Sequence, residues 1–260
     1  MSKINVNTWE PESSTALTMG ASGDTTTVPS GASLVVASGA TINITGATQT
    51  GFPSAGFADT YSTVAASATY TVPTDITKLL VIITGGGGGG APGHATGGKG
   101  SGGCGATTVM ARVTVVAADT ITIVIGAGGA AATPINDGNI GGDSTFTHAT
   151  GSGSGSMSTI TAPGGKPGKY VDIPIAPLAG TVGANNEGIS ILGGYSSFAP
   201  NASNGGATFW GGGGIGTAST IAQATAGTAY GSGGGGGTAT ASWNNSEAGA
   251  NGVCFIMEFK

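Results

Sequence analysis

An apolar run followed closely by a run of glycines decides the fold: Ile76-Thr77-Lys78-Leu79-Leu80-Val81-Ile82-Ile83, and then Gly85 to Gly90. A nearly continuous apolar run of this length predicts a strand that is buried on both faces. Upstream, Ala68-Thr69-Tyr70-Thr71-Val72-Pro73 predicts another strand, and Pro73-Thr74-Asp75 predicts the turn that joins the two.

Three more strands are expected downstream of the glycine run. Residues 106–115 and 120–125 predict two of them, and the alternation Thr120-Ile121-Thr122-Ile123-Val124-Ile125 has the period of two that is typical of a half-buried strand. Val253-Cys254-Phe255-Ile256-Met257-Glu258-Phe259 predicts the third. No stretch has helical periodicity, because Gly, Ser and Thr are spread too evenly for a helix interior.

The stretch between about residues 126 and 250 is mostly Gly, Ala, Ser and Thr, punctuated by aromatic residues. Glycine has no side chain to bury, so this stretch cannot build an ordinary hydrophobic core. Two interpretations stay open from the sequence: long mobile loops, or a tightly packed array of extended backbones.

The composition excludes several classes of protein. There are 53 glycines but only 11 prolines, and the glycines occur in clumps rather than at every third residue, so the chain is not collagen. Charged residues make up 7% of the chain, which excludes disorder through charge repulsion. The net charge is −5 with Arg112 as the single arginine, so no basic stripe exists for nucleic acid.

No targeting or membrane-spanning signal is apparent, and no cofactor is expected. The start Met1-Ser2-Lys3-Ile4-Asn5 has no apolar signal region, so we expect cytoplasmic synthesis without export through the general secretory route. The longest apolar run is too short to span a membrane. Cys104 and Cys254 lack a metal-binding spacing, and two buried thiols are favoured over a disulfide.

Changes in amino-acid composition divide the chain into three parts. Residues 1–50 predict short strands separated by turn signals, and strands this short need partner chains for stability. Residues 51–66 are interpreted as a connector. Residues 67–260 form a glycine-rich β domain.

The third part resembles the glycine-rich domain at the ends of many phage tail fibres. The resemblance rests on an ordered series of blocks that covers about residues 67 to 260. The blocks are Tyr70-Thr71-Val72-Pro73, Ile76-Thr77-Lys78 with the strand and glycine run that follow, Val115 to Gly129, Gly141 to Phe146, Ala162-Pro163-Gly164-Gly165, Tyr230 to Gly237, and Gly249 to Phe259.

The resemblance implies an all-β protein whose glycine-rich domain is a jelly-roll-like sandwich with long glycine-rich loops. It further implies a homotrimeric virion protein, a tail-fibre or adhesin subunit that binds a glycan or an outer-membrane protein on the host surface. Residues 1–50 would attach it to other virion proteins or trimerise it. A capsid decoration protein is the alternative. We expect no enzymatic activity, because the twelve acidic residues are too scattered for a depolymerase's carboxylate pair.

Six aromatic residues in glycine- or serine-rich surroundings are the candidate binding residues. Aromatic side chains in such loops form many binding surfaces, but they can equally fill the holes that glycine leaves. Trp210 and Trp243 are the first candidates for binding. The full set is Tyr195, Phe198, Phe209, Trp210, Tyr230 and Trp243.

Three other motifs are interpreted as loop, turn or surface residues and not as functional sites. Gly93 to Gly100 approaches a phosphate-binding loop, but Gly100 stands where that motif needs Ser or Thr. Asp137-Gly138-Asn139 and Gly142-Asp143 offer oxygen atoms to a cation, yet they fit no EF-hand and read as turns, so no metal site is expected. His94 and His148 have no acidic partner at a diagnostic spacing.

Overall fold

A computed structural model describes most of the chain beyond residue 59. The predicted N-terminal β segment, residues 1–50, lies outside the described residues. No helix occurs in the part that the structure describes, and hence none that could cross a membrane. The described ranges are 60–93, 99–132, 135–149, 157–170, 176–197, 203–217, 223–237 and 246–259.

The described strands form two antiparallel sheets, in the orders β1-β9-β3-β4-β8 and β2-β5-β6-β7. The strands predicted from the sequence correspond to β2, β3, β4, β5 and β9, while β1, β6, β7 and β8 were not predicted as strands. The bounds are β1 Thr60–Val64, β2 Ala68–Thr71, β3 Lys78–Thr84, β4 Thr108–Thr114, β5 Thr120–Val124, β6 Ser144–His148, β7 Ile160–Ala162, β8 Glu187–Ile191 and β9 Val253–Phe259.

A single hydrophobic core lies between the sheets. In β3, the central strand of the larger sheet, Leu79, Val81 and Ile83 are fully buried. They belong to the same cluster as Ile121 of β5 and Phe146 of β6 in the smaller sheet. Each such side chain contributes about 1.5–3 kcal/mol by leaving water. The predicted all-β, jelly-roll-like sandwich is therefore confirmed.

The sandwich begins earlier than the sequence indicates. β1 lies inside the stretch 51–66 that was interpreted as a connector, and it pairs with β9 from Thr60↔Glu258 to Val64↔Cys254. Val64 packs against the core. The end of the predicted connector thus belongs to the sandwich, because its β-branched residues complete the edge of the larger sheet.

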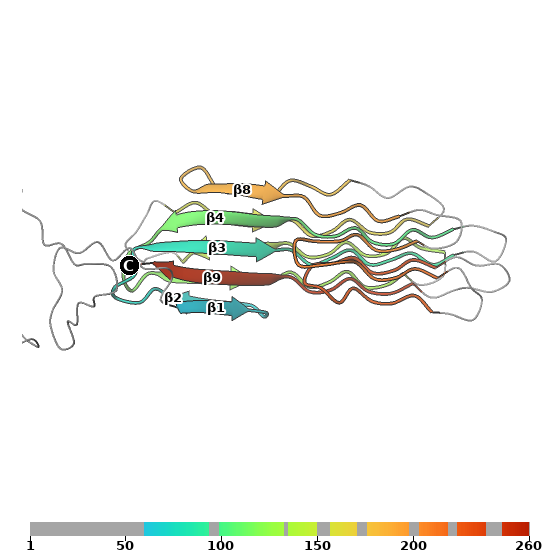
Figure 1. Cartoon of the computed structure of the whole chain (residues 1–260), viewed down its shortest axis with the longest axis horizontal. Helices are drawn as coiled ribbons and strands as arrows, with labels where there is room; N and C mark the ends of the chain where they lie inside the picture. The colour runs from blue at the N-terminus through green and yellow to red at the C-terminus, as the bar shows by residue number, and fades with distance from the viewer. Residues whose placement is uncertain are drawn as a thin grey trace, which may run out of the picture. The chain divides into compact units, whose positions relative to one another are not determined.

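Most strands run on directly into glycine-rich segments at the same end of the sandwich (Figure 1). Stacked sheets lie about 10 Å apart because side chains fill the space between them. Beyond Thr84 the chain continues as glycines, which have no side chains to fill this space. The backbones that continue the two sheets can therefore approach one another. Figure 1 shows the segments that continue β3, β4, β8 and β9 running side by side away from the sheets. We call this bundle the glycine array.

Both cysteines are buried thiols, as the sequence favoured. Cys254 lies in β9, and burial raises the pKa of its thiol to about 12. Cys104 lies in the glycine array, where its Sγ is 3.9 Å from the Ser196 Oγ. The two thiols are thus shielded from reagents in the folded protein.

We expect neither thiol to react with a disulfide reagent such as dithionitrobenzoate at about pH 8 while the protein is folded, because both side chains are buried and burial also disfavours the reactive thiolate of Cys254. Both should react when guanidinium unfolds the chain. The release of thionitrobenzoate, read by absorbance, measures this. Rapid reaction of one thiol per native chain would show that its surroundings are open.

Candidate functional site

The glycine array is organised around the segment Gly85–Ala91. The N–H groups of Gly86 and Gly89 donate to the carbonyls of Gly142 and Asn139, each at an N–O distance of 2.9 Å. Residues three apart in the segment thus bind residues three apart in one antiparallel neighbour. Gly87 and Gly90 bind Ala250 and Glu247 in the same way, and Gly88 and Ala91 bind Cys104 and Ser101.

This pattern defines a helix with three residues per turn. Such an extended helix has no internal hydrogen bonds and rises about 3.1 Å per residue. Its N–H and C=O groups therefore point outward in three directions, and here neighbouring backbones satisfy them. The carbonyls of Gly86, Gly87 and Gly88 accept hydrogen bonds from Gly165, Gly129 and Gly234, on three further segments.

Close approach, rather than unusual backbone angles, explains the glycines of this segment. Among the described glycines, φ is positive only at Gly183, Gly211 and Gly231. A Cβ atom on Gly88, however, would lie closer than 3.0 Å to the Lys166 carbonyl, and one on Gly87 would overlap the Ser232 carbonyl in the same way. The described part of residues 126–250 thus includes a packed array of extended backbones, one of the two interpretations that the sequence left open.

The segments of the array stop together at the end farthest from the sandwich. Gly100 forms a bridge with Tyr170, and Thr217 forms one with Gly237. The Gly100 N–H also donates to the Gly237 carbonyl at 3.1 Å, which joins the two pairs. We call the end marked by these four residues the distal end.

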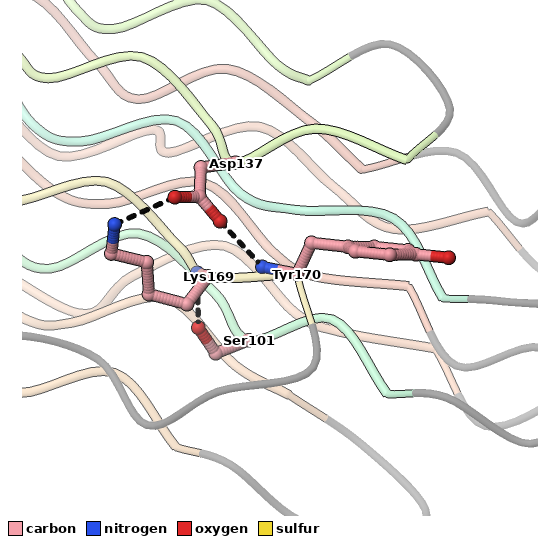
Figure 2. A network of polar contacts seen from close by, with 4 residues as sticks. All are labelled: Ser101, Asp137, Lys169 and Tyr170. Atoms are coloured by element: carbon pink, nitrogen blue, oxygen red, sulfur yellow. Dashed lines mark hydrogen bonds and ion pairs between the residues drawn. The ribbon is translucent and has the colours of Figure 1, made fainter.

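A polar cluster fastens three segments near the distal end (Figure 2). One carboxylate oxygen of Asp137 accepts from the Lys169 Nζ at 2.6 Å, and the other accepts from the Tyr170 N–H at 2.8 Å. The Lys169 N–H donates to the Ser101 Oγ at 2.7 Å. Figure 2 shows the Tyr170 ring projecting away from these contacts. We call Ser101, Asp137, Lys169 and Tyr170 the Asp137 cluster.

The Asp137 cluster stabilises the ionised carboxylate. Burial acts to raise the pKa of Asp137, but the hydrogen bonds from Lys169 and from the Tyr170 N–H, together with the lysine's charge, outweigh it. The pKa of Asp137 is therefore lowered from its usual 3.8. The cluster was not foreseen in the sequence, where Asp137 was interpreted only as a turn residue or a weak cation ligand.

An Asp137→Asn variant tests the cluster. A carboxyl whose pKa is depressed in the folded state adds stability at pH values above its unfolded pKa, and this stability is lost as the pH falls through the folded pKa. The lysine and aspartate side chains are 24% and 41% exposed, so solvent screening limits the effect to about 1 kcal/mol.

The variant should therefore melt at a lower temperature than the wild type at about pH 7, and the difference should be smaller at about pH 2. Thermal unfolding followed by circular dichroism gives the melting temperatures of both proteins at each pH. A difference that stays the same at the two pH values would rule out a stabilising carboxylate.

Three of the six candidate aromatic residues come together, but near the sandwich rather than at the distal end. The rings of Phe209 and Trp210 meet edge to face at 5.1 Å, and those of Trp210 and Tyr230 at 6.2 Å. The Trp210 Nε1 donates to the Thr84 Oγ1 at 2.7 Å, at the end of β3. Trp210 thus fills the junction between sandwich and array, while Phe209 and Tyr230 remain 48% and 41% exposed.

Of the other three candidates, the structure describes only Tyr195. Tyr195 lies on the segment that continues β8 and is 66% exposed. Phe198 and Trp243 lie outside the described residues. A binding role for any of the six stays a prediction.

Two further observations concern other polar groups of the described residues. His148 and Asp119, which the sequence did not associate, lie 3.5 Å apart between Nε2 and Oδ1. Within the described ranges, no pocket is found and no cluster of three or more His, Cys, Asp or Glu side chains could hold a metal.

A comparison with protein-family models gives a match. A family model described as a glycine-rich domain matches residues 62–257, a range that includes nearly all of the described sandwich and array. No curated protein matches the chain.

Proposed function

This chain belongs to the glycine-rich domain family, and from that premise we propose that it is a phage virion protein, a homotrimeric tail-fibre or adhesin subunit whose distal end contacts the host surface. Residues 1–50 would attach the subunit to the particle. The ordered blocks that resemble the ends of phage tail fibres support this proposal, and so does the geometry of the array.

The observation that carries the proposal is that the described segments of the array end together at the distal end, which Gly100, Tyr170, Thr217 and Gly237 mark. Recognition residues are commonly placed on connections that a rigid scaffold holds in position. Here the scaffold is an array whose inner backbones are hydrogen bonded to neighbours in several directions, as at Gly86, Gly87 and Gly88. An array of this kind holds its distal end at a fixed distance from the sandwich.

Tyr170 is the described residue best placed for contact with a ligand. The Asp137 carboxylate and the bridge to Gly100 fix its backbone at the distal end. Its ring projects away from the Asp137 cluster (Figure 2). An aromatic face combined with nearby charged groups suits the apolar face and hydroxyl groups of a sugar, so we propose a surface glycan as the ligand.

Imaging of intact particles at subnanometre resolution tests the location. The proposal expects the protein as a threefold fibre at the tail. Density spread over the capsid lattice would overturn it and assign the chain to a decoration protein.

Competition for adsorption tests the binding end. Purified full-length protein in excess should block attachment of the phage to its host, and Tyr170→Ala should weaken the block by about ten-fold, the scale of one lost aromatic contact. Val116→Ala is the matched control, because Val116 is 51% exposed but lies in the sandwich between β4 and β5, and it should compete as the wild type does. If the control variant blocked attachment less well than Tyr170→Ala, the binding site would have to lie away from the distal end.

A further inference from the structure

The sequence contains two Asn-Gly pairs, Asn204-Gly205 and Asn251-Gly252, and the structure describes both. This pair is especially open to spontaneous deamidation, because glycine has no side chain to hinder an attack by its backbone nitrogen on the asparagine side chain. Asn204 and Asn251 are both exposed to solvent. Sequence and exposure together would therefore predict two reactive sites.

Deamidation proceeds through a cyclic imide. The backbone nitrogen of the glycine loses its proton and bonds to the asparagine Cγ, and the side-chain nitrogen leaves as ammonia. Water then opens the imide at either carbonyl, which gives aspartate or isoaspartate. The first step needs a glycine N–H that is available for proton removal and an asparagine side chain that can turn its Cγ towards that nitrogen.

The array withholds both reacting groups at Asn204. The Gly205 N–H donates to the Gly214 carbonyl at 2.8 Å. The Asn204 Oδ1 accepts from the Gly216 N–H, also at 2.8 Å. The attacking nitrogen and the side chain that it would attack are thus each bonded to the backbone of a neighbouring segment.

The same arrangement recurs at Asn251, just before β9. The Gly252 N–H donates to the Gly126 carbonyl at 2.9 Å. The Asn251 Oδ1 accepts from the Gly128 N–H at 2.9 Å. The two Asn-Gly pairs lie far apart in the sequence, yet backbone hydrogen bonds hold both in the same way.

We propose that Asn204 and Asn251 are latent deamidation sites, which the folded array keeps closed and which react when the array opens around them. Local opening breaks the hydrogen bonds of the two glycine N–H groups, so its free energy sets the rate of the reaction. The protection follows from the array alone and is independent of the proposed host contact.

Deamidation would also make the opening permanent. Isoaspartate places an extra carbon in the main chain, which shifts the residues on either side relative to each other. The array depends on a three-residue period that matches donors to acceptors on its neighbours. A segment that contains isoaspartate can therefore not restore all of its former hydrogen bonds.

Gly212→Asn supplies a matched control inside the same molecule, because it creates a third Asn-Gly pair with Gly213. Gly212 is exposed, its φ is not positive, and a Cβ atom there would meet no described residue within 4 Å. The Gly213 N–H donates no hydrogen bond among the described residues. The new pair thus lacks the hydrogen bond that closes the two native pairs.

The folded full-length variant is incubated at mildly alkaline pH, and mass spectrometry of its peptides follows deamidation at the three positions. We expect the introduced asparagine to react at least about ten-fold faster than Asn204 and Asn251, because those two must wait for the array to open. Circular dichroism checks that the fold is unchanged. Equal rates at the three positions in the folded protein, whether fast or slow, would overturn the proposal.

The wild-type protein gives a second test that needs no substitution. Asn204 and Asn251 should deamidate at least about ten-fold faster in guanidinium than in the folded protein at the same pH and temperature. A folded wild-type protein that deamidates at both sites as fast as the unfolded chain would show that the hydrogen bonds give no protection.

Discussion

Replacing Gly88 with valine should abolish folding, and even Gly88→Ala should lower the free energy of unfolding by more than about 4 kcal/mol. Gly88 lies in the central segment, where its N–H binds the Cys104 carbonyl and its own carbonyl accepts from Gly234. A methyl group at this position would strike the Lys166 carbonyl, which is backbone and cannot rotate away. Accommodating it would separate several hydrogen-bonded segments at once.

The control for this prediction is Gly212→Ala. Gly212 lies in the same array and its φ is not positive, but its added methyl group would meet open space within the described structure. The change should leave stability within about 1 kcal/mol of the wild type, with a small gain from the stiffer unfolded chain. Guanidinium denaturation of both variants measures the contrast. Equal effects at the two positions would mean that the central segment is not closely packed.

The second large effect is expected in the sandwich, where Phe146→Ala should reduce the free energy of unfolding by about 3–5 kcal/mol. Phe146 of β6 is fully buried and belongs to the core cluster that unites the two sheets. Its removal leaves a cavity that the strands on either side cannot collapse to fill. The array should weaken with the sandwich, because β3, β4 and β9 continue directly into it.

Thr145→Ala is the matched control for Phe146→Ala. Neighbouring residues in a strand point to opposite faces, and Thr145 is only partly buried. Its replacement should change stability by less than about 1 kcal/mol. The same denaturation curves report both variants. A Phe146→Ala protein as stable as the Thr145→Ala protein would place the core elsewhere.

The sequence predicted the sandwich better than the array because hydrophobic pattern reports only on side chains. β3, β5 and β9 have apolar runs or alternation that show in the sequence. β8, with Glu187-Gly188-Ile189-Ser190-Ile191, has a glycine and a charge, and it lies at the sheet edge where burial imposes little pattern. β7 has three residues, too few for any pattern to show.

The sequence could not decide between mobile loops and the packed array because the contacts that organise the array join backbones. The segment Gly85–Ala91 is identical in side-chain content to a flexible glycine linker, and only the neighbours that satisfy its N–H and C=O groups make it a three-residue helix. The Asp137 cluster was missed for a related reason. Lys169 is 32 residues from Asp137, and no local spacing signals a pair that array packing creates.

Amide hydrogen exchange, followed by two-dimensional NMR on the folded protein, tests the packed array most directly. If Gly86 to Gly90 form the centre of a hydrogen-bonded array, their amides should exchange as slowly as those of Leu79 and Val81 in β3, since both open only when the domain unfolds. Exchange of Gly86 to Gly90 within the dead time, while Leu79 and Val81 stay protected, would show that the glycine run is a flexible loop and would contradict the account.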